Sequence, residues 1–148
     1  TLIPDFKGET ENIDRIVGVA PEVVSHNLET VRRLTREVRI QAKYDRSLEV
    51  LKYLKDSGIS RTKSGIMLGL GENMEEVIET LEDLRRVSVD IVTLGQYLQP
   101  SKKHLPVVDF VSPDEFKEYE IIAKDLGFRH VESGPLVRSS YKAHKHIH

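Results

Sequence analysis

The chain has 148 residues and a formal net charge of −2, with 31% charged and 39% hydrophobic residues. This length supports one domain with a hydrophobic core, but it falls short of the roughly 250 residues of a complete eight-stranded (β/α) barrel. The near-neutral charge argues against a general nucleic-acid binder, and the absence of cysteine excludes disulfides and cysteine-held zinc or iron–sulfur sites within these residues.

The first half of the chain alternates short apolar runs with helical spacings. The pattern predicts a strand end at 2–6, a helix at 12–19, a strand at 23–26, helical segments at 31–38 and 48–54, and a buried strand at 63–70. Asp45 is positioned to cap the helix at 48–54, and Gly58 is positioned to end it.

The second half begins with the most clearly amphipathic helix of the chain. Its apolar face is made by Met74, Val77, Ile78, Leu81 and Leu84. Asn73 and Glu76 have the spacing of a capping box. A strand at 90–94, a helix from Ser112 to Gly127 and a strand at 128–132 follow. The alternation predicts an α/β fold of about four to five parallel strands without an internal domain boundary.

Polar turns follow three of the predicted strands, where parallel α/β folds carry their chemistry. In the first turn, Asn27 and Glu29 alternate along extended backbone, so an amide and a carboxylate can face one side and bind ribose hydroxyls. The alternative, which spacing alone favours, is that Asn27 caps the next helix and Glu29 lies in its first turn.

The second turn, Gly69–Asn73, belongs to the segment Gly65–Glu72, in which a strand runs into a glycine turn and then a helix. It is not a dinucleotide fingerprint, because Met74 occupies the position of the third glycine. A phosphate-binding turn and a purely structural turn both remain open. The third polar turn, Gly95–Ser101, suits either a cradle for a planar base or an ordinary exposed loop.

The remaining polar patterns have two interpretations each. The arginines at 32, 36 and 39 form a stripe that either docks an acidic partner or is a solvated helix face. Arg138 and the two adjacent serines could bind an anion or a metal; alternatively, they belong to a turn and a polar C-terminus. Alternating histidines at 144, 146 and 148 suit a divalent metal, although an unstructured end is the favoured interpretation.

Six segments, in this order, resemble lipoyl synthases, a family of radical S-adenosylmethionine enzymes. They are Pro4–Gly8, His26–Thr30, Thr62–Glu72, Gly95–Ser101, His104–Val107 and Ser133–Tyr141. The resemblance covers nearly the whole chain and corresponds to the C-terminal half of the family. It implies a partial TIM-type (β/α) barrel with parallel strands, with residues 1–141 as about its second half and 142–148 as a loose tail.

The resemblance implies a sulfurtransferase that inserts two sulfur atoms at C6 and C8 of an octanoyl chain on a lysine of a lipoyl-carrier protein or domain. In the family, one 4Fe-4S cluster cleaves S-adenosylmethionine to a 5′-deoxyadenosyl radical, and a second cluster donates the sulfur. The cysteines that hold both clusters lie N-terminal to this region. We therefore expect these residues to belong to a longer chain and to be inactive alone.

The family's binding residues map onto positions of this sequence. The resemblance implies that Asn27 and Glu29 face the ribose of S-adenosylmethionine, and that Lys63 and Ser64 lie near its methionine and ribose end. Met67, Gln96, Tyr97 and Leu98 would contact the adenine. Ser139, with Ser140 as the alternative and Arg138 orienting the segment, would ligate the sulfur-donating cluster. No catalytic residue is predicted within the chain.

The expected partners follow from the same resemblance. They are an octanoylated carrier and iron–sulfur delivery proteins, with no nucleic acid. The sequence has no apolar run of the ~18 residues that a membrane span needs and no visible signal peptide, so we expect a cytoplasmic protein without membrane contact. The alternatives are a carrier-docking or phosphate-binding half-barrel without activity of its own.

Overall fold

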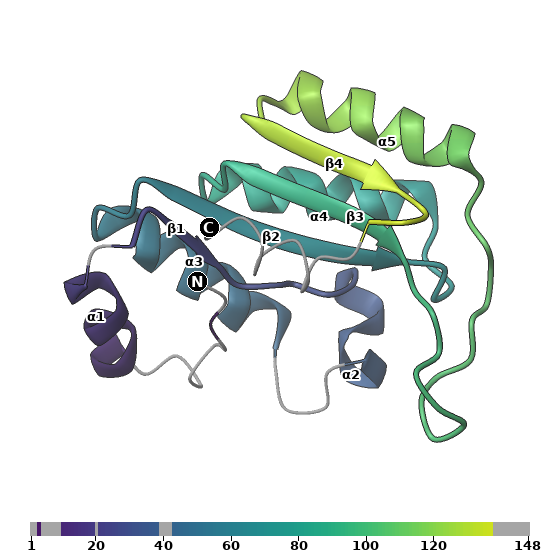
Figure 1. Ribbon diagram of the computed structural model, residues 1–148, viewed down its shortest axis with the longest axis horizontal. Coiled ribbons are helices and arrows are strands. Elements are labelled where there is room, and N and C mark those ends of the chain that lie inside the picture. Colours follow the sequence, from purple (N-terminus) through teal and green to yellow (C-terminus); the bar gives the residue numbers. More distant parts are fainter. Residues whose placement is uncertain (1–2, 4–9, 20, 39–42, 138–148) are drawn as a thin grey trace.

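The computed structural model describes residues 3, 10–19, 21–38 and 43–137. In these residues, four parallel strands form one sheet in the order β1-β2-β3-β4, so strands that follow one another along the chain are neighbours (Figure 1). The strands are β1 Val23–Ser25, β2 Arg61–Leu68, β3 Ile91–Gln96 and β4 His130–Gly134. Sequential parallel strands with helical crossovers confirm the predicted α/β fold, and four strands are half the number of a TIM-type barrel.

Helices connect the strands. They are α1 Thr10–Gly18, the 3₁₀ turn η2 Arg32–Leu34, α2 Thr35–Val38, α3 Tyr44–Asp56, α4 Met74–Arg86 and α5 Pro113–Leu126. The predicted ends of the longer helices are confirmed: Asn73 and Glu76 form a capping box, Ser112 caps α5, and Gly127 ends it in the left-handed conformation. No helix in the described part of the chain combines the length and apolarity of a membrane span.

The helical segment predicted at 31–38 is confirmed, as a 3₁₀ turn over 32–34 followed directly by α2. Two other local predictions were wrong. Asp45 does not cap α3, whose N-cap is Lys43; its carboxylate binds Arg32 instead. Met74 belongs to the solvated side of α4 with 38% exposure. The predicted strand end at 2–6 lies outside the described residues except for Ile3, whose amide donates to Ser25 O at 2.7 Å.

Side chains of the sheet alternate between a helix-facing side and an opposite side. Ile66, Leu68, Val92 and Leu94 pack on the apolar face of α4 in the main core. By strand register, the paired positions between them face away from α4. We call this opposite side the inner face; its members are Val23, Ser25, Arg61, Lys63, Gly65, Met67, Ile91, Thr93, Gly95, His130, Glu132 and Gly134. The inner face is polar or small over most of its area, which is unusual for a sheet interior.

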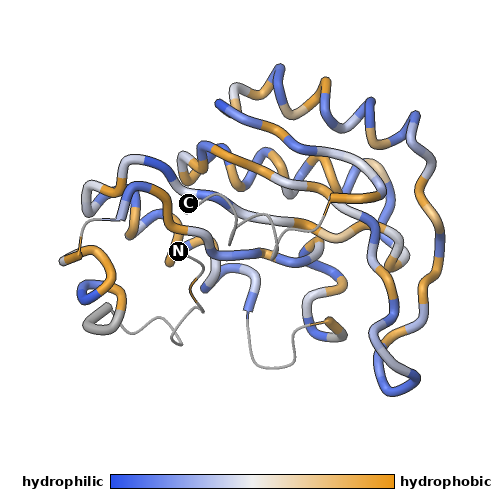
Figure 2. The backbone as a smooth tube through the Cα atoms, viewed as in Figure 1, coloured by the Kyte–Doolittle hydropathy of each residue, from blue (hydrophilic) through white to orange (hydrophobic). Residues whose placement is uncertain are grey.

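A long arm, residues 97–111, joins β3 to α5 without regular secondary structure and extends beyond the sheet (Figure 1). Its tip is hydrophilic, and its returning part is largely hydrophobic (Figure 2). Loops of this length in compact domains are commonly functional. The arm is therefore part of the candidate site, next to the carboxyl ends of the strands.

Candidate functional site

Three buried oxygens on one side of the sheet lack a hydrogen-bond partner among the described residues: Ser25 Oγ, Asn27 Oδ1 and Thr93 Oγ1. Their residues are 1%, 6% and 0% exposed. Ser25 and Thr93 belong to the inner face by strand register. A buried polar group without a partner costs about 1–3 kcal/mol. This cluster is therefore suited to receive a polar ligand.

Asn27 reaches the same side by alternation beyond the end of β1. The flanking residues face the helices: His26 Nε2 lies 3.0 Å from Ser47 Oγ in α3, and Leu28 is fully buried in the main core. Asn27, between them, points to the inner face. The helix-cap interpretation of Asn27 and Glu29 is wrong, because η2 begins after Val31 with no side-chain cap.

Glu29 has a backbone conformation that non-glycine residues rarely adopt. Its φ of 74° lies in the left-handed region. The strand-like bonds of its backbone hold it there: its amide donates to Gly65 O at 2.9 Å, and its carbonyl accepts from Met67 N at 2.8 Å. Such a conformation costs about 1–2 kcal/mol and is most often retained at functional sites.

Lys63 and Ser64 are predicted together but lie on opposite sides of β2. Lys63 is fully buried and belongs to the inner face, level with Ser25. Ser64 faces the helices, and its Oγ accepts the Leu28 amide at 3.0 Å. Ser64 therefore fixes the backbone beside Asn27, while Lys63 is the member of the pair that a ligand on the inner face can approach.

Three of the four residues predicted to contact a planar base meet in one cavity of about 500 Å³. Met67 from β2 and Tyr97 and Leu98 from the start of the arm line it, together with Val38 and the arm residues Pro100, Lys103, His104, Leu105 and Pro106. The Tyr97 hydroxyl donates to Leu105 O at 2.7 Å, which closes the wall of the cavity. A largely apolar lining and this volume are typical of a site for a small organic ligand.

Gln96 positions the arm rather than facing the cavity. Its Nε2 donates to Tyr97 O and Asp109 O, each at 3.0 Å, and its Oε1 accepts from Val111 N at 2.9 Å. The sequence analysis missed this role and the arm itself. The length of the segment between the predicted strand at 90–94 and the predicted helix from Ser112 could have indicated the arm. The partners of Gln96 could not be predicted, because they lie up to 15 residues away.

The glycine turn after β2 is occupied by the chain's own carboxylate. Glu72 accepts the Gly69 amide at 3.0 Å and the Leu70 amide at 3.0 Å. The Asn73 amide donates to Glu76 Oε1, and the Glu76 amide donates to Asn73 Oδ1. A phosphate would have to displace a carboxylate here, so these contacts favour the structural interpretation of the turn.

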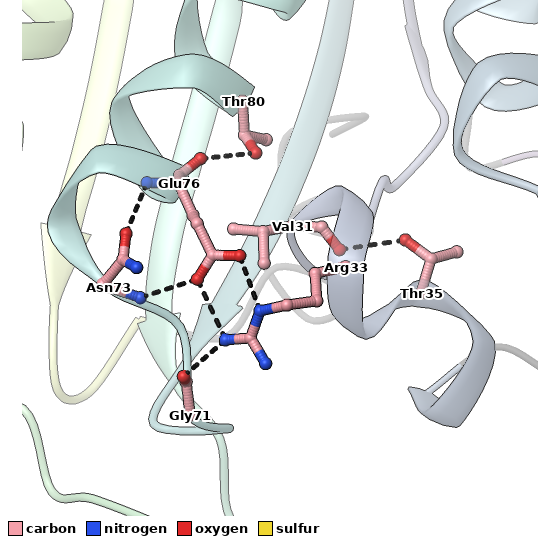
Figure 3. Close-up of polar contacts among 7 residues, drawn as sticks. All are labelled: Val31, Arg33, Thr35, Gly71, Asn73, Glu76 and Thr80. Carbon is pink, nitrogen blue, oxygen red and sulfur yellow. Dashed lines mark hydrogen bonds and ion pairs between the residues drawn. The ribbon is translucent and has the colours of Figure 1, made fainter.

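An ion pair ties the segment after β1 to the start of α4 (Figure 3). Arg33 Nε donates to Glu76 Oε2 at 2.8 Å, and Arg33 Nη2 donates to Glu76 Oε1 at 2.9 Å and to Gly71 O at 2.8 Å. These hydrogen bonds from Arg33 hold the pKa of Glu76 below its ordinary value, against a smaller opposing effect of burial. The pair fixes the backbone that leads out of the turn containing Asn27 and Glu29.

The segment after β4 crosses the inner face at Gly95. A Cβ at Gly95 would lie 2.1 Å from Val137 O, so only glycine allows this approach. The predicted cluster ligand Ser139, with Arg138 and Ser140, lies outside the described residues, as do Arg39, the alternating histidines and the tail 142–148. Among the described residues, no group of three or more histidine or acidic side chains is arranged to hold a metal ion.

Comparison with known proteins identifies relatives of this sequence. The sequence profile of the Radical SAM superfamily matches residues 2–84. The chain is 75% identical over 148 residues to "Lipoyl synthase, mitochondrial" of Nematostella vectensis, covering 100% of this chain and 51% of that protein. It is 76% identical over 147 residues to a lipoyl synthase of Christiangramia forsetii, covering 99% and 50%. A lipoyl synthase of Treponema denticola is 55% identical over 146 residues, covering 99% and 50%. The chain thus spans about half the length of the curated relatives it matches.

Proposed function

Since the chain belongs to the Radical SAM superfamily, we propose that it forms about half of a lipoyl synthase and supplies most of the S-adenosylmethionine-facing wall of that enzyme. The enzyme inserts sulfur at C6 and C8 of an octanoyl chain on a carrier lysine. S-adenosylmethionine and two 4Fe-4S clusters supply the hydrogen-abstracting radical and the sulfur. Similarity to lipoyl synthases along the whole chain supports this assignment.

The observation that carries the proposal is the pairing of a polar cluster with an apolar cavity on one side of the sheet. S-adenosylmethionine has a polar ribose, an amino-acid end and a planar adenine. The unpartnered oxygens of Ser25, Asn27 and Thr93 offer hydrogen bonds to the polar parts. The cavity lined by Met67 and Tyr97 offers an apolar surface to the adenine.

We propose the following roles for the predicted residues. Asn27 and Glu29 bind the ribose hydroxyls, and the Lys63 ammonium binds the methionine carboxylate. Met67, Tyr97 and Leu98 hold the adenine, as their common cavity supports. Gln96 and Ser64 do not contact the ligand but position the residues that do. The Gln96 side chain holds the arm, and the Ser64 side chain holds the backbone beside Asn27.

Equilibrium binding of S-adenosylmethionine to the full-length, cluster-reconstituted protein tests the ligand assignment. Thr93→Val and Asn27→Leu each remove a hydrogen bond to the ligand, so we expect affinity to fall about five- to tenfold for each. Thr62→Val is the matched control, since Thr62 Oγ1 is also buried and unpartnered among the described residues but is paired in register with the helix-facing Val24. Equal affinities for the three variants and the parent protein would reject the assignment.

The clusters require residues outside this chain, which has no cysteine. We propose that Ser139 adds an oxygen ligand to the sulfur-donating cluster; Val137, two residues earlier, lies against Gly95 on the inner face, which supports this. The full-length enzyme should contain about eight irons, and the 148 residues alone should contain none and be inactive. In the full-length enzyme, Ser139→Ala should lower iron content, whereas Ser140→Ala should leave it unchanged.

The partners and the compartment are proposals of the same kind. An octanoylated carrier protein or domain is the substrate, and iron–sulfur delivery proteins load the clusters. A cytoplasmic location stays a prediction, because one relative is named as mitochondrial and another comes from a bacterium. Cell fractionation with antibody detection of the full-length protein would test the location.

A further inference from the structure

A second hollow, of about 570 Å³, lies between the segment after β1 and α3. Five cationic side chains line it, Arg32, Arg33, Arg36, Lys43 and Arg46, against two carboxylates. We call it the basic hollow. The whole chain has a net charge of −2, so this positive charge is a local concentration and not a reflection of composition.

Two of the five cations are committed to other parts of the protein. Arg32 Nη1 lies 2.8 Å from Asp45 Oδ1, and its guanidinium stacks over the Tyr44 ring at 4.3 Å from the centroid. Arg33 is held by Glu76 at 2.8 Å. These contacts form the walls of the basic hollow and fix its shape.

The other three cations are uncompensated. Within the part of the chain that the structure describes, Arg36, Lys43 and Arg46 make no ion pair. Arg36 and Lys43 are exposed, and Arg46 is half-buried. Three unpaired cations around one hollow produce a positive field that attracts an acidic surface.

The basic hollow adjoins the apolar cavity, with α2 between them. Arg36 lines the basic hollow, whereas Val38, two residues later on α2, lines the cavity beside Met67. The segment that carries these residues directly follows Glu29, at the carboxyl end of β1. A protein that rests on the basic hollow therefore has its surface next to the mouth of the cavity.

We propose that the basic hollow docks an acidic surface patch of the protein that carries the octanoyl-lysine, an inference that rests on the proposed function. A substrate attached to a protein needs a surface that holds the protein while its lysine arm reaches the inner face beside the cavity. Complementary charge steers such an encounter and fixes its orientation. An acidic patch on a protein suits this site better than RNA, because the positive charge is concentrated in one hollow, whereas an extended polyanion needs basic groups along its length.

The test is steady-state kinetics of the full-length enzyme with two substrates, the intact octanoylated carrier and a short neutral octanoyl-lysine peptide. The charge-reversed variant is Arg36→Glu with Lys43→Glu; a glutamate at the N-cap of α3 is compatible with the helix dipole, so the fold is kept. We expect KM for the carrier to rise about tenfold and its salt dependence to weaken. Turnover of the peptide and S-adenosylmethionine affinity should not change.

A matched control separates local from general charge effects. Lys117→Glu makes the same kind of charge reversal on the exposed side of α5 and should leave KM for the carrier unchanged. An unchanged carrier KM in the double variant would overturn the docking proposal. Absence of turnover of both substrates by the parent enzyme would instead overturn the proposed function.

Discussion

At the scale of single residues, the carboxylate of Glu76 serves two structures at once. It accepts the Asn73 amide of the capping box at 3.0 Å and both donors of Arg33. Arg33 lowers the pKa of this carboxyl group. A carboxyl group whose pKa is lowered on folding stabilises the protein above its unfolded pKa, and this contribution is lost as the pH falls through the folded pKa.

The Glu76→Gln variant tests this linkage. Glutamine keeps an acceptor for the cap but loses the charge, so at neutral pH we expect a loss of up to about 1 kcal/mol in the free energy of unfolding. The difference between the parent and the variant should shrink as the pH falls below the ordinary carboxyl pKa of about 4.3. Urea unfolding of both proteins over a pH series measures this difference in the free energy of unfolding. A difference that does not change with pH would contradict the role assigned to Arg33.

A comparison of Gly58 with Gly69 distinguishes the cost of backbone strain from the cost of steric clash when glycine is replaced by alanine. Gly58 and Gly69 have nearly the same φ, 99° and 100°, but only Gly69 is crowded. A Cβ at Gly69 would lie 2.3 Å from Gln96 Nε2 and 2.4 Å from Asp109 O, whereas nothing lies within 4 Å at Gly58. Gly58→Ala should cost about 1 kcal/mol of stability from conformation alone. Gly69→Ala should cost about 2–4 kcal/mol, because the arm must also move.

Unfolding midpoints of the two alanine variants, measured side by side in the same protein, give this comparison. Equal losses of stability would mean that the arm yields easily at Asp109. That result would also argue against Gln96 as the anchor of the arm, because a Cβ at Gly69 would meet the hydrogen bond between Gln96 Nε2 and Asp109 O.

At the scale of elements, the arm 97–111 depends on one buried side chain. Gln96 donates to two carbonyls and accepts one amide, on both sides of the arm. Gln96→Glu replaces the donor with an acceptor, so two carbonyl groups then face a carboxylate. We expect trypsin cleavage after Lys102 and Lys103 at the tip to accelerate about tenfold.

Gln99→Glu is the control for the arm, since Gln99 makes one exposed hydrogen bond, to His104 O at 2.9 Å. Limited proteolysis with mass detection of the fragments distinguishes the two variants. Cleavage of the Gln96→Glu protein at the parent rate would show that the arm is held by its other contacts, such as Tyr97 with Leu105.

Helix ends and strand centres could be predicted because their causes are local. The capping box of Asn73 and Glu76 acts over three residues, and Gly127 follows its own helix directly. Asp45 was misassigned because its partner, Arg32, comes from 13 residues away. The opposite orientations of Lys63 and Ser64 follow from strand alternation, but which side is the inner face is decided only when α4 packs on the sheet.

At the scale of the whole molecule, the fold class was predictable and the site only partly so. Alternating strands and amphipathic helices define the parallel sheet, whatever its ligands. Met67, Tyr97 and Leu98 were predicted from a resemblance, and the structure brings them to one cavity. The unpartnered Ser25 and Thr93 were not predicted, because an unpartnered oxygen is a property of packing that sequence spacing does not contain.

The described sheet has two open edges. β1 pairs only with β2, and β4 pairs only with β3, within the residues that the structure describes. Open sheet edges make a fold marginal and prone to associate. We expect the isolated 148 residues to unfold at low temperature or to aggregate. Reversible, cooperative unfolding at high temperature, observed by calorimetry, would contradict this expectation.

The single turn of α2 separates the cavity from the basic hollow, and this shared wall has a thermodynamic consequence. Any ligand of one hollow that shifts α2 changes the binding free energy of the other. Because such coupling is reciprocal, a carrier that strengthens S-adenosylmethionine binding by some factor is itself bound more strongly by the same factor once the small molecule is present. Cooperative binding of the carrier protein and S-adenosylmethionine would then depend on the four residues of α2.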